Sequence, residues 1–218
     1  MKLKLLAATK NKGKIKEIAG LFAGSSLPVT VYSLTDFNID DEAPESGETF
    51  LANSIEKSLF YSRRVKDIYI AADDSGLAVE ALGGRPGVHS ARYAAGTGQP
   101  KDDEKNIEKL LFELNDTAME NRQAKFVTVI TLSMNGKVIE SFFGEVAGII
   151  LSEKRGTGGF GYDPVFFYPP LQKTFAELSI EEKNQISHRA QAFGKLKLFI
   201  QETLSRKGFL TSQSFCRE

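Results

Sequence analysis

Two long apolar runs joined by Asn135-Gly136 restrict the possible folds more than any other feature of the chain. The run KFVTVITLS at 125–133 is rich in β-branched residues, and the run KVIESFFGEVAGII directly follows the dipeptide. Asn-Gly between two such runs is typical of a type I′ hairpin, whose strands are antiparallel. Elsewhere, strand and helix patterns mix without a regular alternation. The sequence therefore predicts an α/β protein with a mixed sheet.

Two adjacent aspartates, Asp73 and Asp74, follow the apolar run at 68–72. We expect this strand to end at them, with a turn at Ser75-Gly76 and further apolar residues after it. Adjacent carboxylates repel one another, and removing them from water adds to the cost. An Asx turn needs only one aspartate, whereas a hard metal ion or a proton transfer can use two. Because α/β sheets bind ligands at the carboxyl ends of strands, the pair favours a functional site.

The charge balance of the chain argues against bulk nucleic-acid binding. Lys and Arg total 28 and Asp and Glu total 28, so the formal net charge is zero. Proteins that bind DNA or RNA usually carry a basic surplus, although a local basic pocket is compatible with this balance. The hydrophobic content of 41% can supply a folded core. We expect one domain of two lobes at 1–204 and a frayed tail at 205–218.

Few side chains are available as soft metal ligands. The chain has two histidines, His89 and His188, and one cysteine, Cys216. A typical zinc site needs several such ligands, so a bound metal would be a hard cation on carboxylates, and Mg²⁺ is the expected ion. One cysteine allows no disulfide within the chain, and the sequence shows neither a signal peptide nor a membrane-spanning run. We therefore expect a cytoplasmic protein without membrane association.

A helix is predicted at 49–65, where Leu51, Ile55 and Leu59 recur every four residues and form an apolar face. Lys57 lies on another face of this helix, together with the asparagine one turn before it. A lysine on an amphipathic helix is most often solvated at the surface. Lys57 alone therefore does not decide the function.

The last helix is predicted to begin at Ser179, because Glu182 three residues later completes a capping box. Lys183, His188 and Arg189 lie within it. His188 and Arg189 are adjacent and do not share a helical face, yet both can border a cleft that runs alongside the helix. Surface solvation is the commoner situation for such residues. The apolar stripe of this helix consists of Ile186, Phe193, Leu196 and Ile200.

The polar segment TKNKGK at 9–14 joins a predicted strand to a predicted helix. Its backbone N–H groups and the start of the helix can bind phosphate. It is not a Walker A loop, because Ala8 and Ile15 stand where that pattern requires Gly and Ser or Thr. Taken alone, the segment is slightly better explained as a solvated helix start that carries lysines.

Two further loops are candidates for a site. The acidic run at 36–48 contains no Lys or Arg, and it is either an exposed loop or, through one or two members, a metal site. The Gly-rich loop GTGGFGYDP at 156–164 would let a ligand approach the backbone closely. Phe160 in this loop can stack on a nucleobase or pack in a core. Together, the donor loop, helix lysine, carboxylates, aromatic ring and basic edge outline a nucleoside triphosphate site.

Five segments form a combined pattern that is far more specific than any single motif: LAATKNKGK, ESGETFLANSIEKS, ADDSGLAVEALGGRPGVHSARYA, GTGGFGYDPVF and ELSIEEKNQISHRAQAF. In this order they resemble the inosine triphosphate pyrophosphatases, the Ham1-type enzymes that act on non-standard purine nucleotides. The resemblance covers nearly the whole chain up to the tail. It implies an ITPase-like fold of two α/β lobes around a long mixed, twisted sheet with a central cleft, and it implies a homodimer.

The resemblance also implies an activity and a set of site residues. The activity is Mg²⁺-dependent hydrolysis of dITP, ITP and XTP to the monophosphate and pyrophosphate, which clears deaminated purines from the nucleotide pool. Asp74 matches the catalytic residue, and Glu45 and Asp74 match the metal-binding acids, although Pro44 before Glu45 leaves the second acid open. Lys10 and Lys12 make the first turn more basic than in many relatives. The substrate-binding positions are Thr9, Lys10, Asn11, Lys12, Gly13, Lys14, Lys57, Ser75, Phe160, Gly161, Tyr162, Asp163, Lys183, His188 and Arg189.

We expect Asp74 to orient or deprotonate a water that attacks the α-phosphorus, with Lys14 and Lys57 stabilising the leaving charge. Asp73 is a further possible metal ligand. Arg189 and His188 can donate to the 6-oxo group of hypoxanthine or xanthine, whereas adenine presents a 6-amino donor. Guanine also carries a 6-oxo group, so these residues do not explain its rejection. Two alternatives stay open: a Maf-like pyrophosphatase of other base specificity and a nucleotide sensor without catalysis.

Overall fold

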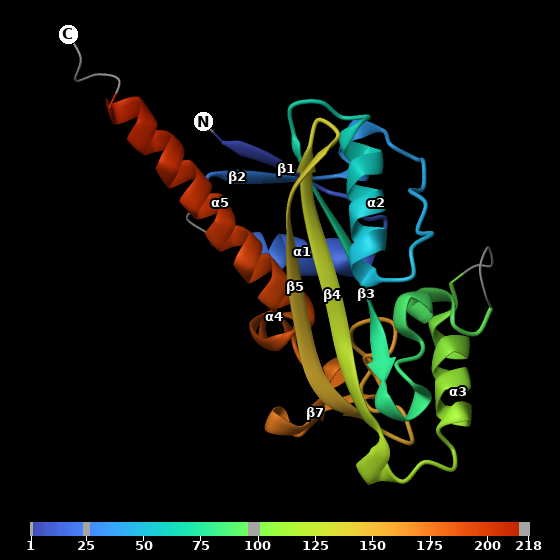
Figure 1. Cartoon of the computed structure of the whole chain (residues 1–218). Helices are drawn as coiled ribbons and strands as arrows, with labels where there is room; N and C mark the ends of the chain where they lie inside the picture. Colours follow the sequence, from blue (N-terminus) through green and yellow to red (C-terminus); the bar gives the residue numbers. More distant parts are fainter. Residues whose placement is uncertain (1, 24–26, 96–100, 214–218) are drawn as a thin grey trace.

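One mixed β-sheet organises the computed structural model, which describes residues 2–23, 27–95 and 101–213 (Figure 1). Within these residues the sheet has seven strands in the order β2-β1-β3-β4-β5-β6-β7. β1 is parallel to β2 and β3, and the remaining neighbours are antiparallel, which confirms the predicted fold class. The strands are β1 (Leu3–Ala7), β2 (Val29–Ser33), β3 (Tyr69–Val79), β4 (Gln123–Met134), β5 (Lys137–Ile150), β6 (Phe166–Tyr168) and β7 (Lys173–Thr174).

The predicted hairpin is confirmed as the pair β4–β5. Asn135 and Gly136 form its turn, with φ angles of 51° and 76°. Both central residues of a type I′ turn need positive φ, and Asn and Gly adopt it more readily than other residues. The local conformational preference of these two residues is therefore enough to specify the hairpin turn.

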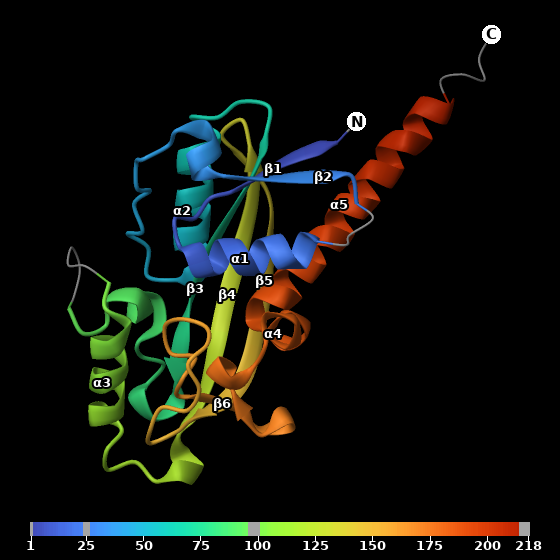
Figure 2. The ribbon, with the colours of Figure 1, turned by 180° about the vertical axis from the view of Figure 1, so that it is seen from behind.

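Helices cover both faces of the sheet (Figures 1 and 2). α1 (Lys12–Phe22) and α5 (His188–Gln213) pack on one face, and α2 (Phe50–Ser62) packs on the other. Successive strand residues point to opposite faces. Leu5 accordingly lies in the core beneath α1 and α5, whereas Leu6 lies in the core on the α2 side.

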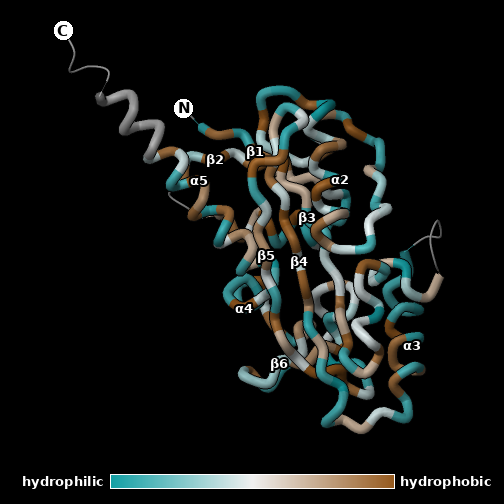
Figure 3. Tube along the Cα trace, viewed as in Figure 1, coloured by the Kyte–Doolittle hydropathy of each residue, from teal (hydrophilic) through white to brown (hydrophobic). Residues whose placement is uncertain are grey.

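A second region of the molecule forms around the distal ends of β3, β4 and β5. α3 (Asp103–Glu113) covers this end, and its Leu110 packs with Leu77, Phe126 and Phe166 in a separate core. Figure 3 shows that hydrophobic stretches follow the strands through the centre of the molecule. Short 3-10 helices connect these elements at Leu34–Phe37, Glu80–Leu82, Gly87–Arg92, Met119–Asn121, Pro169–Leu171 and Phe175–Glu177.

The predicted turn at Ser75-Gly76 is wrong, because β3 continues unbroken from Tyr69 to Val79. Ser75 pairs with Thr128 of β4, and Gly76 pairs with Val127 of the same strand. Pairing along the whole of β4 outweighs the local turn preference of a Ser-Gly dipeptide. Asp73 and its neighbour Asp74 therefore lie in the middle of a strand. The expected strand end exists instead on β1, which stops beside Ala71.

The helix predicted at 49–65 is present as α2, but its apolar residues do not form the buried face. Leu51 is 46% exposed, whereas Ser54, Ser58 and Ser62 are fully buried against the sheet. Ser58 Oγ donates to Ser133 Oγ at 2.5 Å, and Ser54 makes a similar contact with a β4 threonine. Small hydroxyl side chains bring the helix close to the strands while satisfying one another's hydrogen bonds.

Replacing Ser58 by leucine should therefore destabilise the protein by about 1–3 kcal/mol, because the larger side chain overpacks the contact with β4. The reverse exchange, Leu51→Ser, should change the free energy of unfolding by less than about 0.5 kcal/mol at this half-exposed position. Urea denaturation of both variants tests the assignment. The opposite ranking would mean that the leucine face, and not the serine face, packs on the sheet.

The predicted last helix is divided in two. Ser179 and Glu182 form the expected capping box at the start of α4 (Ile180–Ile186), but Ser187 is extended, with φ −67° and ψ 157°. α5 starts at His188 immediately after this break. Consequently Ile186 packs in the core around α3, whereas Phe193, Leu196 and Ile200 of α5 pack in the core between α5 and the sheet.

α5 projects from the body of the molecule and remains helical through Gln213 (Figure 1). Residues 214–218 lie outside the described residues, and the frayed tail expected at 205–218 stays a prediction. The domain boundaries stay a prediction. Among the residues that the structure describes, no helix combines the length and apolarity needed to cross a membrane.

Candidate active site

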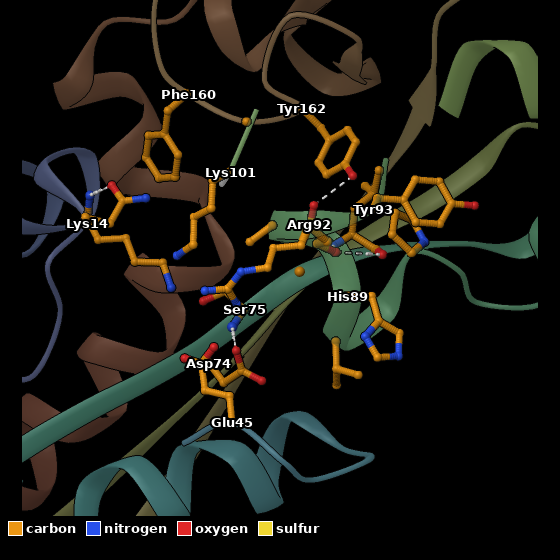
Figure 4. Close-up of a pocket in the computed structure, with 18 of the residues that line it drawn as sticks. Lys14, Glu45, Asp74, Ser75, His89, Arg92, Tyr93, Lys101, Phe160 and Tyr162 are labelled. Atoms are coloured by element: carbon orange, nitrogen blue, oxygen red, sulfur yellow. Dashed lines mark hydrogen bonds between the residues drawn. The ribbon is translucent and has the colours of Figure 1, made fainter. Parts of the chain in front are cut away.

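A pocket of about 730 Å³ lies beside the middle of β3 (Figure 4). The last contact of β1 with this edge is the hydrogen bond from Ala8 N–H to the Ala71 carbonyl at 2.9 Å. Further along the same edge, Leu77 N–H donates to Ser90 Oγ of the 3-10 helix at 2.8 Å. The pocket occupies the interval between these two contacts. A strand that outlasts its parallel neighbour thus creates a ligand site at the carboxyl end of β1.

Nearly all of the sequence-predicted residues line this pocket. The exceptions are Lys12, whose side chain is exposed to solvent, and Gly13. Those that line it are Thr9, Lys10, Asn11, Lys14, Glu45, Lys57, Asp74, Ser75, Phe160, Gly161, Tyr162, Asp163, Lys183, His188 and Arg189.

The first turn presents its donors around the start of α1. Asn11 is the N-cap, and its side chain accepts hydrogen bonds from the N–H groups of Gly13 at 2.8 Å and Lys14 at 3.1 Å. A Cβ at Gly13 would overlap the Phe160 ring, so glycine is what lets this ring sit against the helix start. Lys10 is bound to the Asp40 carbonyl. The turn therefore connects the Phe160 ring to the Lys14 side chain.

The two adjacent aspartates point to opposite faces of β3 and have different surroundings. Asp73 faces α1 and α5, where its Oδ2 lies 2.7 Å from Lys14 Nζ and 3.5 Å from Arg189 Nε. Ser75 Oγ also donates to this carboxylate at 2.9 Å. Burial acts to raise the pKa of Asp73, but the charges of Lys14 and Arg189 outweigh it and hold the pKa well below its ordinary value. Asp73 is a permanent anion that fixes two cations.

Asp74 faces α2 and has no cation bonded to it among the described residues. Its Oδ2 accepts from Asn53 Nδ2 at 3.1 Å, and its Oδ1 accepts from Ser75 N–H at 3.1 Å. Burial raises the pKa of Asp74 to about 6, and the charge of Glu45 acts in the same direction. This carboxylate can therefore take up and release a proton near neutral pH.

The donor set beside Asp74 fits a hard divalent cation. Glu45 lies beside Asp74 (Figure 4), and its Oε1 is 2.5 Å from Lys57 Nζ. Lys57 also donates to the Asp73 carbonyl at 3.3 Å, so one lysine links the acidic loop to β3. The described residues hold no cluster of three or more potential metal ligands. Two carboxylates suffice for Mg²⁺ when substrate phosphates complete its shell.

The Gly-rich loop is folded around the buried carboxylate of Asp163. Phe160 N–H donates to Asp163 Oδ2 at 2.9 Å, and Lys183 Nζ lies 2.6 Å from the same oxygen. A side chain at Gly159, where φ is +74°, would collide with this carboxylate. The loop thus presents one face of Phe160 to the pocket, with Lys183 Nζ 4.9 Å and Arg189 Cζ 5.3 Å from the ring centre.

The break at Ser187 places His188 and Arg189 at the start of α5 beside this ring. His188 stacks on Phe126, with ring centroids 5.0 Å apart, and both of its ring nitrogens are buried without a hydrogen-bond partner. Burial lowers the pKa of His188 well below its ordinary value, and the Arg189 charge acts in the same direction. His188 is accordingly a neutral imidazole that can donate from one nitrogen and accept at the other.

Comparison with known proteins identifies the family. Residues 5–199 match the model of the Ham1 family. The chain belongs to this family. A dITP/XTP pyrophosphatase of Geobacillus kaustophilus is 49% identical over 204 residues, which cover 94% of this chain and 97% of the relative. The solved Ham1 protein of Staphylococcus aureus has a TM-score of 0.79 at 42% identity, and the match covers 92% of this chain and 99% of that one. A HAM1 protein from Coxiella burnetii also reaches a TM-score of 0.79, at 36% identity.

One buried charge of this Ham1-family chain, which binds two residues of the pocket lining, was missed in the sequence. Glu17 of α1 is 5% exposed. Its Oε1 lies 2.8 Å from Lys183 Nζ, and its Oε2 is bound to Arg189. The only signal in the sequence is that Glu17 follows Lys14 by three residues and so lies on the same helix face.

Glu17 completes an unbroken series of alternating charges along the Ham1 pocket. The series connects the Gly-rich loop to the middle of β3. Each cation in it lies between two carboxylates or beside one, which offsets the cost of burying the charges. Its members, in order, are Asp163, Lys183, Glu17, Arg189, Asp73 and Lys14.

Proposed function

We propose that this Ham1-family chain hydrolyses deaminated purine nucleoside triphosphates, namely dITP, ITP and XTP, to the monophosphate and pyrophosphate. The observation that carries the proposal is the pairing of two different ends in one pocket. Asp74 and Lys57 line the pocket at the middle of β3, where Lys14 reaches the neighbouring Asp73, whereas the Phe160 ring lines it at the start of α1. The relative from Geobacillus kaustophilus is named a dITP/XTP pyrophosphatase, which supports the same conclusion.

The phosphate side supplies both charge and a base. A triphosphate brings about four negative charges, so attack by water needs cations to offset the repulsion. Lys14 and Lys57 lie where they can contact the phosphates. Each oxygen of Asp74 accepts one hydrogen bond and keeps a free lone pair. Asp74 can therefore take the proton of a water as its oxygen bonds to the α-phosphorus and the bond to the bridging oxygen breaks, releasing pyrophosphate.

A divalent metal is part of the proposal. Glu45 and Asp74 are the residues that would hold Mg²⁺, because both line the pocket and Asp73 is already committed to Lys14 and Arg189. When bound there, Mg²⁺ would neutralise phosphate charge and make a nearby water more acidic. Lys57 would then exchange part of its contact with Glu45 for a phosphate oxygen.

The base side selects by hydrogen-bond polarity. His188 offers a buried N–H with no partner among the described residues, and Arg189 offers donors only. The 6-oxo group of hypoxanthine or xanthine can accept from both residues, whereas the 6-amino group of adenine leaves the donor-only Arg189 unpaired. The Phe160 ring supplies stacking, worth about 1–3 kcal/mol per base. The discrimination against guanine is not explained by these residues.

Pyrophosphate release from ITP should exceed release from ATP by about 10²-fold or more, because adenine leaves buried donors unsatisfied. It should stop when EDTA removes divalent ions. A panel of purine and pyrimidine triphosphates, assayed with and without Mg²⁺, measures both effects. Equal rates on ITP and ATP would refute the donor argument, and a preference for pyrimidines would favour a Maf-like enzyme. Nucleotide binding without any pyrophosphate release would indicate a sensor.

The homodimer and the cytoplasmic location that the family resemblance implies stay predictions. Light scattering of the full chain measures the first. The absence of a nucleic-acid partner likewise rests on the zero net charge alone.

A further inference from the structure

Arg92 is a pocket residue that none of the roles above uses. It is the last residue of the 3-10 helix Gly87–Arg92, and its side chain extends into the pocket near Ser75 and Asp74 (Figure 4). Its Nε is buried and has no hydrogen-bond partner among the described residues. A buried donor without a partner is unusual in native proteins and calls for an explanation.

Arg92 differs in this respect from three lysines of the pocket wall. Lys14, Lys57 and Lys183 each lie within 2.8 Å of a carboxylate oxygen. To bind phosphate, these lysines must weaken an existing ion pair. Arg92 takes part in none of the ion pairs or side-chain hydrogen bonds formed by the described residues, so its guanidinium can accept an anion without that competition.

The 3-10 helix is fixed closely to β3, two residues beyond Asp74. Ser90 Oγ accepts from Leu77 N–H at 2.8 Å and donates to the Gly87 carbonyl at 2.6 Å. A Cβ at Gly76 would collide with both Ser90 and Gly87, so the backbones are in direct contact. The backbone of Arg92 is thereby held at a set distance from the Asp74 carboxylate.

Asn106 of α3 fixes the chain on both sides of Arg92. This buried side chain donates from Nδ2 to the Ala91 carbonyl at 3.1 Å and accepts at Oδ1 from Ala94 N–H at 2.8 Å. Lys109, one turn further along α3, donates to the Tyr93 carbonyl at 2.9 Å. A buried amide used in this way preorganises the arginine that it flanks, which lowers the entropy lost when an anion binds.

The order of elements along β3 indicates which phosphates Arg92 meets. Phe160 packs against Gly13 at the start of α1, so the base end of the pocket lies beside the end of β1. The 3-10 helix bounds the opposite end, and Asp74 lies between the two. A nucleotide with its base on Phe160 and its α-phosphate at Asp74 therefore directs its outer phosphates towards Arg92.

We propose that Arg92 binds the two phosphates that leave as pyrophosphate, and that Asn106 is its positioning residue. The inference rests on the proposed function for the orientation of the nucleotide. A guanidinium carries a planar fork of donors that matches two phosphate oxygens at once, which a lysine cannot reproduce. Arg92 thus contributes to affinity for the triphosphate and for pyrophosphate, but not for the monophosphate product.

Calorimetric titration of the full chain with pyrophosphate and with inosine monophosphate tests the proposal, because neither measurement needs turnover. Arg92→Gln should weaken pyrophosphate binding by about tenfold or more and change monophosphate binding by less than about twofold. Arg92→Lys should fall between wild type and Arg92→Gln. Arg85→Gln is the matched control: this arginine of the same loop is ion-paired to Glu113 at 3.2 Å and its side chain is 60% exposed, so pyrophosphate affinity should not change.

Asn106→Ala, checked for folding by its thermal transition, should weaken pyrophosphate binding in the same direction. The double variant with Arg92→Gln should be no weaker than Arg92→Gln alone, because Asn106 acts through the arginine. Unchanged pyrophosphate affinity in Arg92→Gln, or an equal loss for both ligands, would overturn the proposal. A wild type that binds pyrophosphate through Arg92 but fails to hydrolyse ITP would overturn only the proposed function.

Discussion

Asp74→Asn should lower the rate of pyrophosphate release from ITP by about 10³-fold, while the variant still binds the nucleotide. Asparagine keeps the shape of the side chain and the hydrogen bonds at the carbonyl oxygen, but it cannot take the proton of the attacking water. Loss of a general base typically costs about 10²–10⁴-fold in rate. Single-turnover kinetics give the rate, and calorimetry with a non-hydrolysable ITP analogue gives the affinity.

Glu42→Gln provides the matched control for this experiment. Glu42 is an exposed carboxylate that also lines the pocket but has no place in the mechanism. Its replacement should leave both the rate and the affinity near wild type. Turnover of Asp74→Asn within about tenfold of wild type would remove Asp74 from the role of base, since no general base is worth so little.

Glu17→Gln should destabilise the protein by about 3–5 kcal/mol, which is among the largest effects expected of any single change in the chain. Glu17 is the buried anion between Lys183 and Arg189. Its neutralisation leaves two like charges close together with too little compensation. Urea denaturation at neutral pH measures the loss. Glu145→Gln, which breaks an exposed pair with Lys125 at 3.2 Å, should cost less than about 1 kcal/mol.

The difference in the free energy of unfolding between wild type and Glu17→Gln should depend on pH, which provides an independent check. Burial acts to raise the pKa of Glu17, but the charges of Arg189 and Lys183 outweigh it and place the pKa below its ordinary value of 4.5. A lowered pKa in the folded state gives stability that is present above the ordinary value and is lost as the pH falls through the folded one. The difference in the free energy of unfolding between wild type and Glu17→Gln should therefore shrink as the pH falls below 4.5 towards the pKa of Glu17 in the folded state. A difference that stays constant down to strongly acidic pH would contradict the charge argument.

Local patterns in the sequence predicted some elements well and misplaced others for identifiable reasons. The β4–β5 hairpin was predictable because its turn depends on the backbone freedom of Asn135 and Gly136 themselves. The Ser75-Gly76 turn was wrong because pairing with β4 along the whole of β3 is a long-range effect. The buried face of α2 consists of serines, whose low hydrophobicity gives no periodic signal, so only the helix itself was predicted.

Some residues of the candidate site were likewise predictable from the sequence, and others were not. Most of the residues that the resemblance pointed to line the pocket, including Asp74 and Phe160. The sequence left Asp73 open as a further metal ligand beside Asp74, whereas the structure pairs its carboxylate with Lys14 and Arg189. Glu17 stayed hidden because its partner Arg189 is 172 positions away in the chain. Arg92 stayed hidden because an unpaired buried donor is visible only in three dimensions.

The unbroken course of β3, with β4 and β5 beside it, has a mechanical consequence. These strands run past the pocket and link the core around α3 to the core beneath α1 and α5. Continuous strand pairing at the level of Asp74 opposes bending there. We therefore expect the loops that flank the opening, and not the sheet, to adjust when a nucleotide enters or its products leave.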